Sequence, residues 1–278
     1  MTGRIRVGVG GWDYDPWRES FYPPRLPKTK QLEHMAARLT AVEINATYYK
    51  LQKPELFERW AKSVPEDFRF AVKGSRFCSN RKILGEAGEA VERFCNQGFT
   101  ELGDRLGPIL WQFMATKRFE PDDFRAFLAL LPGKVAGVPL RHVVEPRHES
   151  FRDPEFVAMA RAAGVGIVFA DSDEFPCLAD LSGDFAYARL QRSRESVAKG
   201  YPAKALKRWA EVAKAWARGE SPEGFPYVAD PPPARPRDTY VFFIAGAKER
   251  NPAAATDLVE RLIPGPRRPS HARSPIYR

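Results

Sequence analysis

The chain has 278 residues, of which 44% are hydrophobic and 28% charged, and a formal net charge of +9. This composition predicts a globular protein with a sizeable core, and no apolar run approaches the roughly 20 residues needed to span a bilayer. The three cysteines, Cys78, Cys95 and Cys177, show no CxxC spacing, which argues against a disulfide framework or a cysteine-based metal cluster. No secretory signal precedes the first expected strand, so we expect a cytoplasmic protein without a membrane partner.

The last residues differ in composition from the rest of the chain. The segment 264–278 is rich in proline, serine and arginine and contains no acidic residue. This predicts a basic, disordered tail that follows a single domain at 1–263. A basic balance permits binding to a polyanion such as nucleic acid but does not establish it.

Eight short apolar segments alternate with helical or connecting segments. The first, 3–12, ends in a glycine pair that predicts a tight turn, and the others lie at 41–49, 67–74, 107–113, 141–151, 164–172, 185–191 and 239–246. Apolar residues at helical spacing predict helices at 30–39, 54–64, 85–106, 121–132, 153–164, 201–219 and 252–263. The alternation predicts parallel βαβ units, and eight strands favour an α/β fold with a single closed (β/α)8 TIM-type barrel.

Polar side chains stand at the carboxyl ends of these strands, where such barrels place their working site. Glu43 and Asn45 are two residues apart, and Glu145 and Arg147 repeat this spacing, so each pair shares one strand face. The other strand ends contribute Trp12, Tyr14, Tyr48, Lys73, Gln112, His148, Asp171, Arg189 and Gln191. A buried ion-pair network that only fixes the barrel is the alternative, but polar groups at most strand ends favour a ligand site.

The charges at this predicted mouth favour a small anionic or hydroxyl-rich ligand. Lys73, Arg147 and Arg189 would hold negative charge on a substrate. Glu43 and Glu145 are the predicted catalytic residues, one of them acting as general acid or base. Hydrolysis of a phosphoester or of a glycoside would fit this set, and the residues do not choose between them.

Amide, aromatic and imidazole groups complete the predicted binding set. Asn45 would orient the substrate. Trp12, Tyr14 and Tyr48 offer rings on which a sugar or a base can stack. His148 follows directly on the fifth strand end and is included with them.

A cofactor is not indicated by any motif, and no metal ligand is assigned. One divalent cation, Mg or Mn, held by Glu43, Glu145, Asp171 and His148 stays open as an alternative. The chain has four histidines and no HExxH or CxxC spacing, which argues against zinc. The dinucleotide fingerprint, the phosphate-binding P-loop and the GxSxG elbow are also missing from the sequence.

Three stretches resemble a known family. They are VGVGGWDYDPWRESFYP at 7–23, AVEINATYYKLQKPELFERWAKSVPEDFRFAVKGSR at 41–76 and VVEPRHESF at 143–151. Together they are similar to the domain-of-unknown-function 72 (DUF72) family, also called YecE-like. The resemblance implies a TIM-type barrel with no established reaction. Its pattern falls on Gly11, Trp12, Tyr14, Trp17, Phe21, Tyr22, Pro23, Glu43, Asn45, Tyr48, Trp60, Lys73, Glu145, Arg147, His148 and Arg189.

Two strand ends depart from the pattern of that family. Arg189 is followed by Leu190 and Gln191 where the family tends to read R.HG, and Ile244 and Ala245 stand where it tends to have amides. Three functions therefore stay open. The chain is an enzyme, a nucleic-acid binder that uses the tail and the positive mouth, or a degenerate barrel that binds or scaffolds without catalysis.

Overall fold

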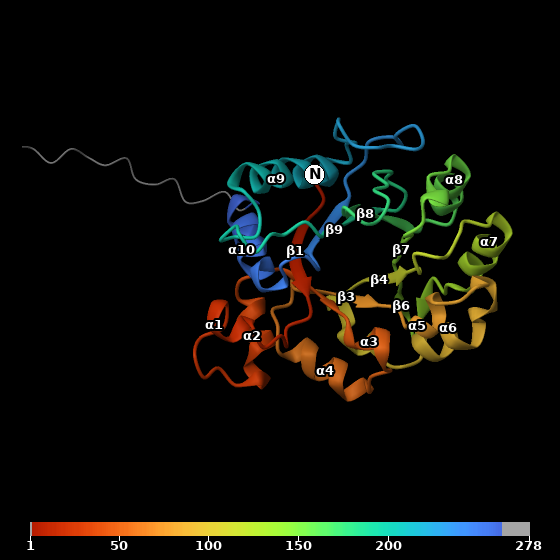
Figure 1. Ribbon diagram of the computed structural model, residues 1–278. Coiled ribbons are helices and arrows are strands. Elements are labelled where there is room, and N and C mark those ends of the chain that lie inside the picture. Colours follow the sequence, from red (N-terminus) through yellow and green to blue (C-terminus); the bar gives the residue numbers. More distant parts are fainter. Residues whose placement is uncertain (1, 263–278) are drawn as a thin grey trace, which may run out of the picture.

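Eight parallel strands close into a barrel in a computed structural model that describes residues 2–262. Helices surround the ring of strands (Figure 1), and the predicted (β/α)8 TIM-type barrel is confirmed. Around the barrel the order is β1-β10-β9-β8-β7-β4-β3-β2. The strands are β1 (Ile5–Gly10), β2 (Ala41–Ile44), β3 (Arg69–Lys73), β4 (Leu106–Gln112), β7 (His142–Glu145), β8 (Gly166–Asp171), β9 (Phe185–Leu190) and β10 (Asp238–Phe243). The tail predicted at 264–278 lies outside the described residues.

Ten α-helices and five 3-10 helices are found within 2–262. The α-helices are α1 (Trp17–Ser20), α2 (Gln31–Ala36), α3 (Ala46–Tyr49), α4 (Pro54–Lys62), α5 (Arg76–Ser79), α6 (Gly88–Cys95), α7 (Pro121–Leu130), α8 (Pro154–Ala162), α9 (Ala203–Arg218) and α10 (Asn251–Leu262). The 3-10 helices are η1 (Lys28–Lys30), η2 (Leu84–Ala87), η3 (Phe99–Arg105), η4 (Glu149–Phe151) and η5 (Lys248–Arg250). In the part of the chain that is described, none of the helices has the length and apolar character to cross a membrane.

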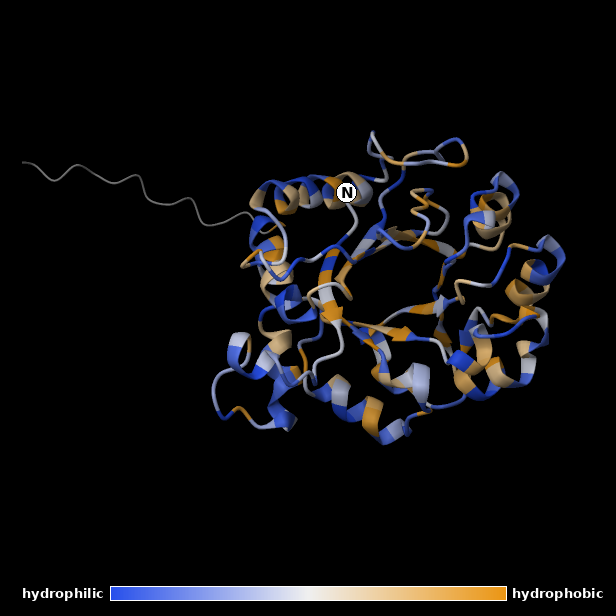
Figure 2. Ribbon diagram, in the orientation of Figure 1, coloured by the Kyte–Doolittle hydropathy of each residue, from blue (hydrophilic) through white to orange (hydrophobic). Residues whose placement is uncertain are grey.

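Alternate residues of each strand pack into two separate cores, because successive side chains of a strand point to opposite faces. On β3, Ala71 lies in the core inside the barrel, whereas Phe70 and Val72 pack under the surrounding helices. Figure 2 shows hydrophobic residues concentrated along the strands and on one side of the helices. An unpredicted two-stranded hairpin, β5 (Lys134–Val135) and β6 (Val138–Pro139), precedes β7.

The continuous helix predicted at 85–106 is wrong. The segment forms η2, α6 and η3 in succession, interrupted at Gly98, whose φ of 97° lies in the left-handed region. A Cβ at this position would approach the ring of Pro54 at the start of α4 to 2.5 Å. Glycine is therefore required where the chain turns close to α4, and the helix ends there.

The strand predicted at 41–49 is shorter than expected and ends at Ile44. Asn45 has helical backbone angles, with φ −90° and ψ −17°, and α3 follows it. The Thr47 hydroxyl donates to the carbonyl oxygens of Ile44 (3.1 Å) and Lys73 (2.7 Å), which fixes the chain in this turn. Asn45 consequently does not continue the strand face of Glu43, as the spacing alone predicted.

Candidate functional site

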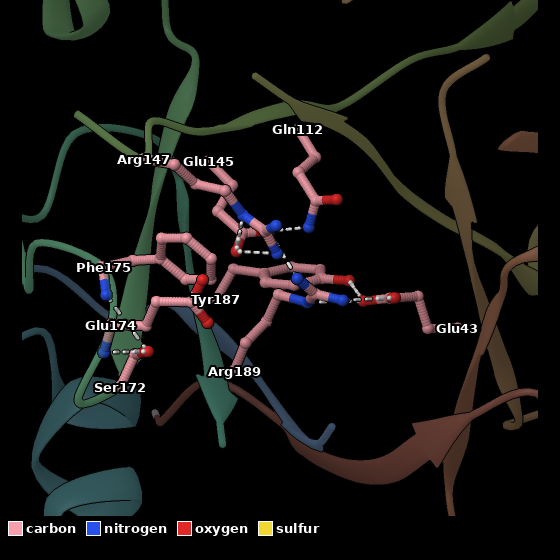
Figure 3. A network of polar contacts seen from close by, with 9 residues as sticks. All are labelled: Glu43, Gln112, Glu145, Arg147, Ser172, Glu174, Phe175, Tyr187 and Arg189. Atoms are coloured by element: carbon pink, nitrogen blue, oxygen red, sulfur yellow. Dashed lines mark hydrogen bonds and ion pairs between the residues drawn. The ribbon is translucent and has the colours of Figure 1, made fainter. Parts of the chain in front are cut away.

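A buried arginine joins two buried glutamates inside the barrel, near its carboxyl end. Arg189 on β9 donates through Nε (3.2 Å) and Nη2 (3.0 Å) to the carboxylate of Glu43 on β2. Through Nη1 it also donates to Glu145 on β7, and Figure 3 shows this bridge across the barrel. Both carboxylates are fully buried and Arg189 is 2% exposed. Three strands that are distant in sequence therefore meet at one guanidinium.

Two further side chains complete this buried layer. The hydroxyl of Tyr187 donates to Glu43 Oε2 at 2.9 Å, and Gln112 Nε2 donates to Glu145 Oε2 at 2.7 Å. Tyr187 was not predicted as a site residue, although it precedes Arg189 by two positions and so shares its strand face. The buried acceptors thus have partners, as buried polar groups require.

Burial and neighbouring charges shift the pKa values of two groups in this layer, Glu145 and Arg189. Burial acts to raise the pKa of Glu145, but Arg189 and Arg147 outweigh it and hold the pKa below its ordinary value of 4.5. Burial likewise acts to lower the pKa of Arg189, and the two glutamates raise it above its ordinary value. Glu145 and Arg189 are therefore both ionised at neutral pH.

Lys73 and Arg147 form the rim of the mouth beside this layer. Lys73, the last residue of β3, is 9% exposed, and its ammonium lies 4.3 Å from the ring centroid of Tyr48. Among residues 2–262 this ammonium has no hydrogen-bond acceptor and no carboxylate partner. Burial, joined by the positive charge of the nearby Arg189, lowers the pKa of Lys73 to about 8.

Arg147 is held in place by an aromatic ring and a carboxylate. Its guanidinium lies 4.0 Å from the ring centroid of Phe175 and donates to Glu145 Oε1 through two contacts of 3.3 Å. Ser172 Oγ accepts from the backbone N–H of Phe175 and so fixes the loop after β8 (Figure 3). Phe175 was not foreseen, because this loop has no periodicity that could indicate a ring under Arg147.

Two predicted stacking residues are engaged in packing. Trp12 meets Trp60 edge to face at 5.0 Å between ring centroids, and Tyr14 meets Trp17 at 5.4 Å. Tyr14 also lies under the ammonium of Lys248, 4.1 Å from the ring centroid. Both rings line the outer rim of the barrel, and their role in substrate stacking stays a prediction.

His148 and Asp171 do not join the buried glutamates. His148 Nδ1 accepts from the backbone N–H of Ser150 at 3.1 Å and caps η4. Asp171 pairs with Arg192 at 3.3 Å. Within 2–262 no group of three or more His, Cys, Asp or Glu side chains is arranged to hold a metal ion, so the Mg or Mn alternative finds no ligand set there.

Comparison with known proteins identifies the family. A family model described as "Protein of unknown function DUF72" matches residues 6–275. The chain belongs to the DUF72 family. Among its relatives, the UPF0759 protein YecE of Escherichia coli K12 is 34% identical over 142 residues. The UPF0759 protein YunF of Bacillus subtilis 168 is 37% identical over 70 residues.

The matched parts of these relatives are limited in length. The match to YecE covers 50% of this chain and 48% of YecE, and the match to YunF covers 25% of this chain and 23% of YunF. A DUF72 protein of Thermotoga maritima MSB8 superposes with a TM-score of 0.72 over 93% of this chain and 99% of its own, at 24% identity. The DUF72 chains thus share this barrel, and at that identity the likeness bears on the fold alone.

Proposed function

We propose that the barrel mouth binds a small phosphate-bearing substrate and that this DUF72 protein is a hydrolase that cleaves its phosphoester bond. The observation that carries the proposal is the Lys73 ammonium, which is nearly buried yet has no acceptor among the described residues. A cation that has lost much of its hydration and has no carboxylate partner is costly. A bound anion supplies the missing partner and accepts charge-assisted hydrogen bonds from it.

The balance of charge at the mouth supports the same ligand class. Glu43 is occupied by Arg189, and Glu145 is shared between Arg189 and Arg147, so neither carboxylate pairs with Lys73. Lys73 and Arg147 add two cations to this layer, and three cations then face two carboxylates. One negative group at the rim restores neutrality in a partly buried region, where Coulomb interactions are stronger than in water.

The contacts favour a phosphoester over a glycoside. Glycoside hydrolysis by the usual mechanism needs a carboxylic acid that is still protonated at the working pH. The pKa of Glu145 is instead held below 4.5, and the Glu43 carboxylate accepts three hydrogen bonds from Arg189 and Tyr187. We therefore assign these glutamates to positioning Arg189, and their predicted acid or base role stays a prediction.

The proposed reaction divides the chemistry between two rim residues. Water adds its oxygen to phosphorus and releases one proton to solvent, while the bond from phosphorus to the alcohol oxygen breaks. Arg147 neutralises charge on the phosphoryl oxygens. Lys73, whose pKa of about 8 keeps it largely protonated at neutral pH, donates a proton to the departing alcohol oxygen and regains one from solvent.

The test compares wild type with Lys73→Met. We expect inorganic phosphate to bind wild type in isothermal titration and to bind the variant at least about tenfold more weakly, since a charged hydrogen bond contributes roughly 1.5–3 kcal/mol. Turnover of p-nitrophenyl phosphate and of its bis-ester, with and without Mg²⁺, measures catalysis. Lys50→Met, an exposed lysine, is the matched control.

A second panel separates the alternatives. A single-stranded oligonucleotide in the same titration tests nucleic-acid binding, which must weaken steeply with added salt. Equal phosphate binding by wild type and Lys73→Met would overturn the proposal. Phosphate binding without turnover of either ester would favour the non-catalytic barrel.

A further inference from the structure

A small cavity lies at the carboxyl ends of β1, β2 and β10, beside the mouth. Its volume is about 140 Å³, close to the roughly 150 Å³ of a cavity that holds one benzene ring. Its walls are mostly apolar, and three polar side chains, Asn45, Lys248 and Asn251, stand among them. We call it the ring pocket; it is lined by Gly10, Trp17, Asn45, Phe243, Ile244, Ala245, Lys248 and Asn251.

The frame of the ring pocket is fixed by hydrogen bonds. Trp17 Nε1 donates to the carbonyl oxygen of Lys248 at 2.9 Å. Asn251 Nδ2 donates to the carbonyl oxygen of Ala245 at 3.1 Å, which holds this alanine at a positive φ of 57°. The loop after β10 is therefore preorganised, and a ligand would not have to order it.

The Lys248 ammonium and the Asn45 amide have no partner among residues 2–262, and the buried Asn251 Oδ1 also lacks one. The Lys248 ammonium lies 4.1 Å from the Tyr14 ring centroid and 5.8 Å from that of Trp17, but within 2–262 it meets no acceptor or carboxylate. The Asn45 side-chain amide likewise makes no hydrogen bond to any described residue. A purely apolar ligand would desolvate both groups without compensation, whereas a ring that carries hydroxyl groups offers them donors and acceptors.

Asn45 also connects the ring pocket to the rim. The register of β2 and β3 pairs Ile44 with Val72, and the Thr47 hydroxyl joins the carbonyl oxygens of Ile44 and Lys73, so the turn at Asn45 lies beside Lys73. Neighbouring strands lie about 4.8 Å apart. A ring in the pocket and a phosphate at Lys73 are thus close enough to belong to one small molecule.

We propose that the ring pocket binds the sugar ring of a sugar phosphate whose phosphate lies at Lys73 and Arg147. The ring hydroxyls accept hydrogen bonds from Lys248 and both donate to and accept from the Asn45 amide, and the apolar face of the ring packs against the partly exposed Ile244. This inference rests on the proposed function and names its substrate class.

The experiment measures how much more tightly the protein binds a sugar phosphate than inorganic phosphate. Isothermal titration of wild type with inorganic phosphate and with ribose 5-phosphate should show at least about tenfold tighter binding of the sugar phosphate. Lys248→Met should lose most of this preference while its affinity for inorganic phosphate stays unchanged. Lys248→Arg, which keeps the charge, should retain part of it, and Lys204→Met, an exposed lysine of α9, should leave both affinities unchanged.

The outcomes separate the two proposals. If inorganic phosphate binds and depends on Lys73, but ribose 5-phosphate binds no more tightly, only the ring pocket assignment fails. An unchanged preference in Lys248→Met, with the thermal unfolding of the variant equal to that of wild type, also overturns it. If neither compound binds wild type, the proposed function and the ring pocket both fail.

Discussion

The two ends of the barrel arrange their charges in opposite ways. At the amino end, Arg141 lies 3.0 Å from Asp184 and 3.2 Å from Asp238, and all three side chains are partly exposed. At the carboxyl end, Lys73 and Lys248 lie over aromatic rings without a carboxylate partner in the described part of the chain. Charges that are already paired in solvent need no ligand, whereas partly desolvated cations without partners indicate one. The candidate site is thus recognisable from the charges of this chain alone.

The strongest test of this contrast removes the arginine between the two glutamates. Arg189→Met leaves Glu43 and Glu145 buried without their cation, and breaking a buried ion pair in this way typically costs about 3–5 kcal/mol. We expect the free energy of unfolding in a urea titration to fall by at least that amount. A loss below about 1 kcal/mol would show that the buried layer does not hold the barrel together.

Acid should remove part of the same stabilisation. Because the pKa of Glu145 is lowered on folding, the unfolded chain binds its proton more readily, and its contribution to stability is present above the ordinary pKa of 4.5 and lost as the pH falls below it. We expect Glu145→Gln to be about 2 kcal/mol less stable than wild type at neutral pH. The gap should narrow as the pH is lowered to about 3, and a constant gap would contradict the ionised pair.

Alkaline pH should weaken anion binding at the rim without unfolding the protein. Lys73 loses its proton around pH 8, so an anion held by its ammonium should bind about tenfold more weakly at pH 9 than at neutral pH. Sulfate is a suitable probe because its own charge is constant over this range. In Lys73→Met this pH dependence should vanish, and its persistence would assign it to another group.

The smallest effect is expected at the amino end. Arg141→Met removes two partly exposed ion pairs, which contribute about 0–1 kcal/mol. The free energy of unfolding and the affinity for phosphate should both stay close to wild type. A loss as large as that of Arg189→Met would erase the distinction between the two ends.

The hydrophobic pattern of the sequence predicts the barrel well, but it predicts less well where the individual helices and strands begin and end. Eight strands follow from apolar segments that alternate with helical ones. The breaks do not, because Gly98 takes a positive φ where the chain passes too close to Pro54 for any Cβ to fit, and this closeness is a tertiary effect. Strand β2 stops at Ile44 for a similar reason, since Thr47 bonds to the carbonyl of Lys73 on the neighbouring strand.

The sequence predicts which residues lie in the site, but it does not predict which of them contact one another. Strand-end position selects Glu43, Glu145 and Arg189, because all barrel strands carry their functional residues at the same end. Their mutual contacts depend on barrel closure, which brings together residues 146 apart in sequence. The ring under Arg147 and the position of Lys248 depend on loops, whose conformation no periodicity encodes.

The position of Arg189 late in the sequence also determines when the barrel can close during synthesis. During synthesis, Glu43 and Glu145 emerge first, and their shared cation arrives only with β9. Until then a closed half-barrel would enclose two carboxylates with no counter-charge, which is costly. We therefore expect that a nascent chain released before residue 189 stays open to proteases, and that resistance appears only once the later strands have left the ribosome.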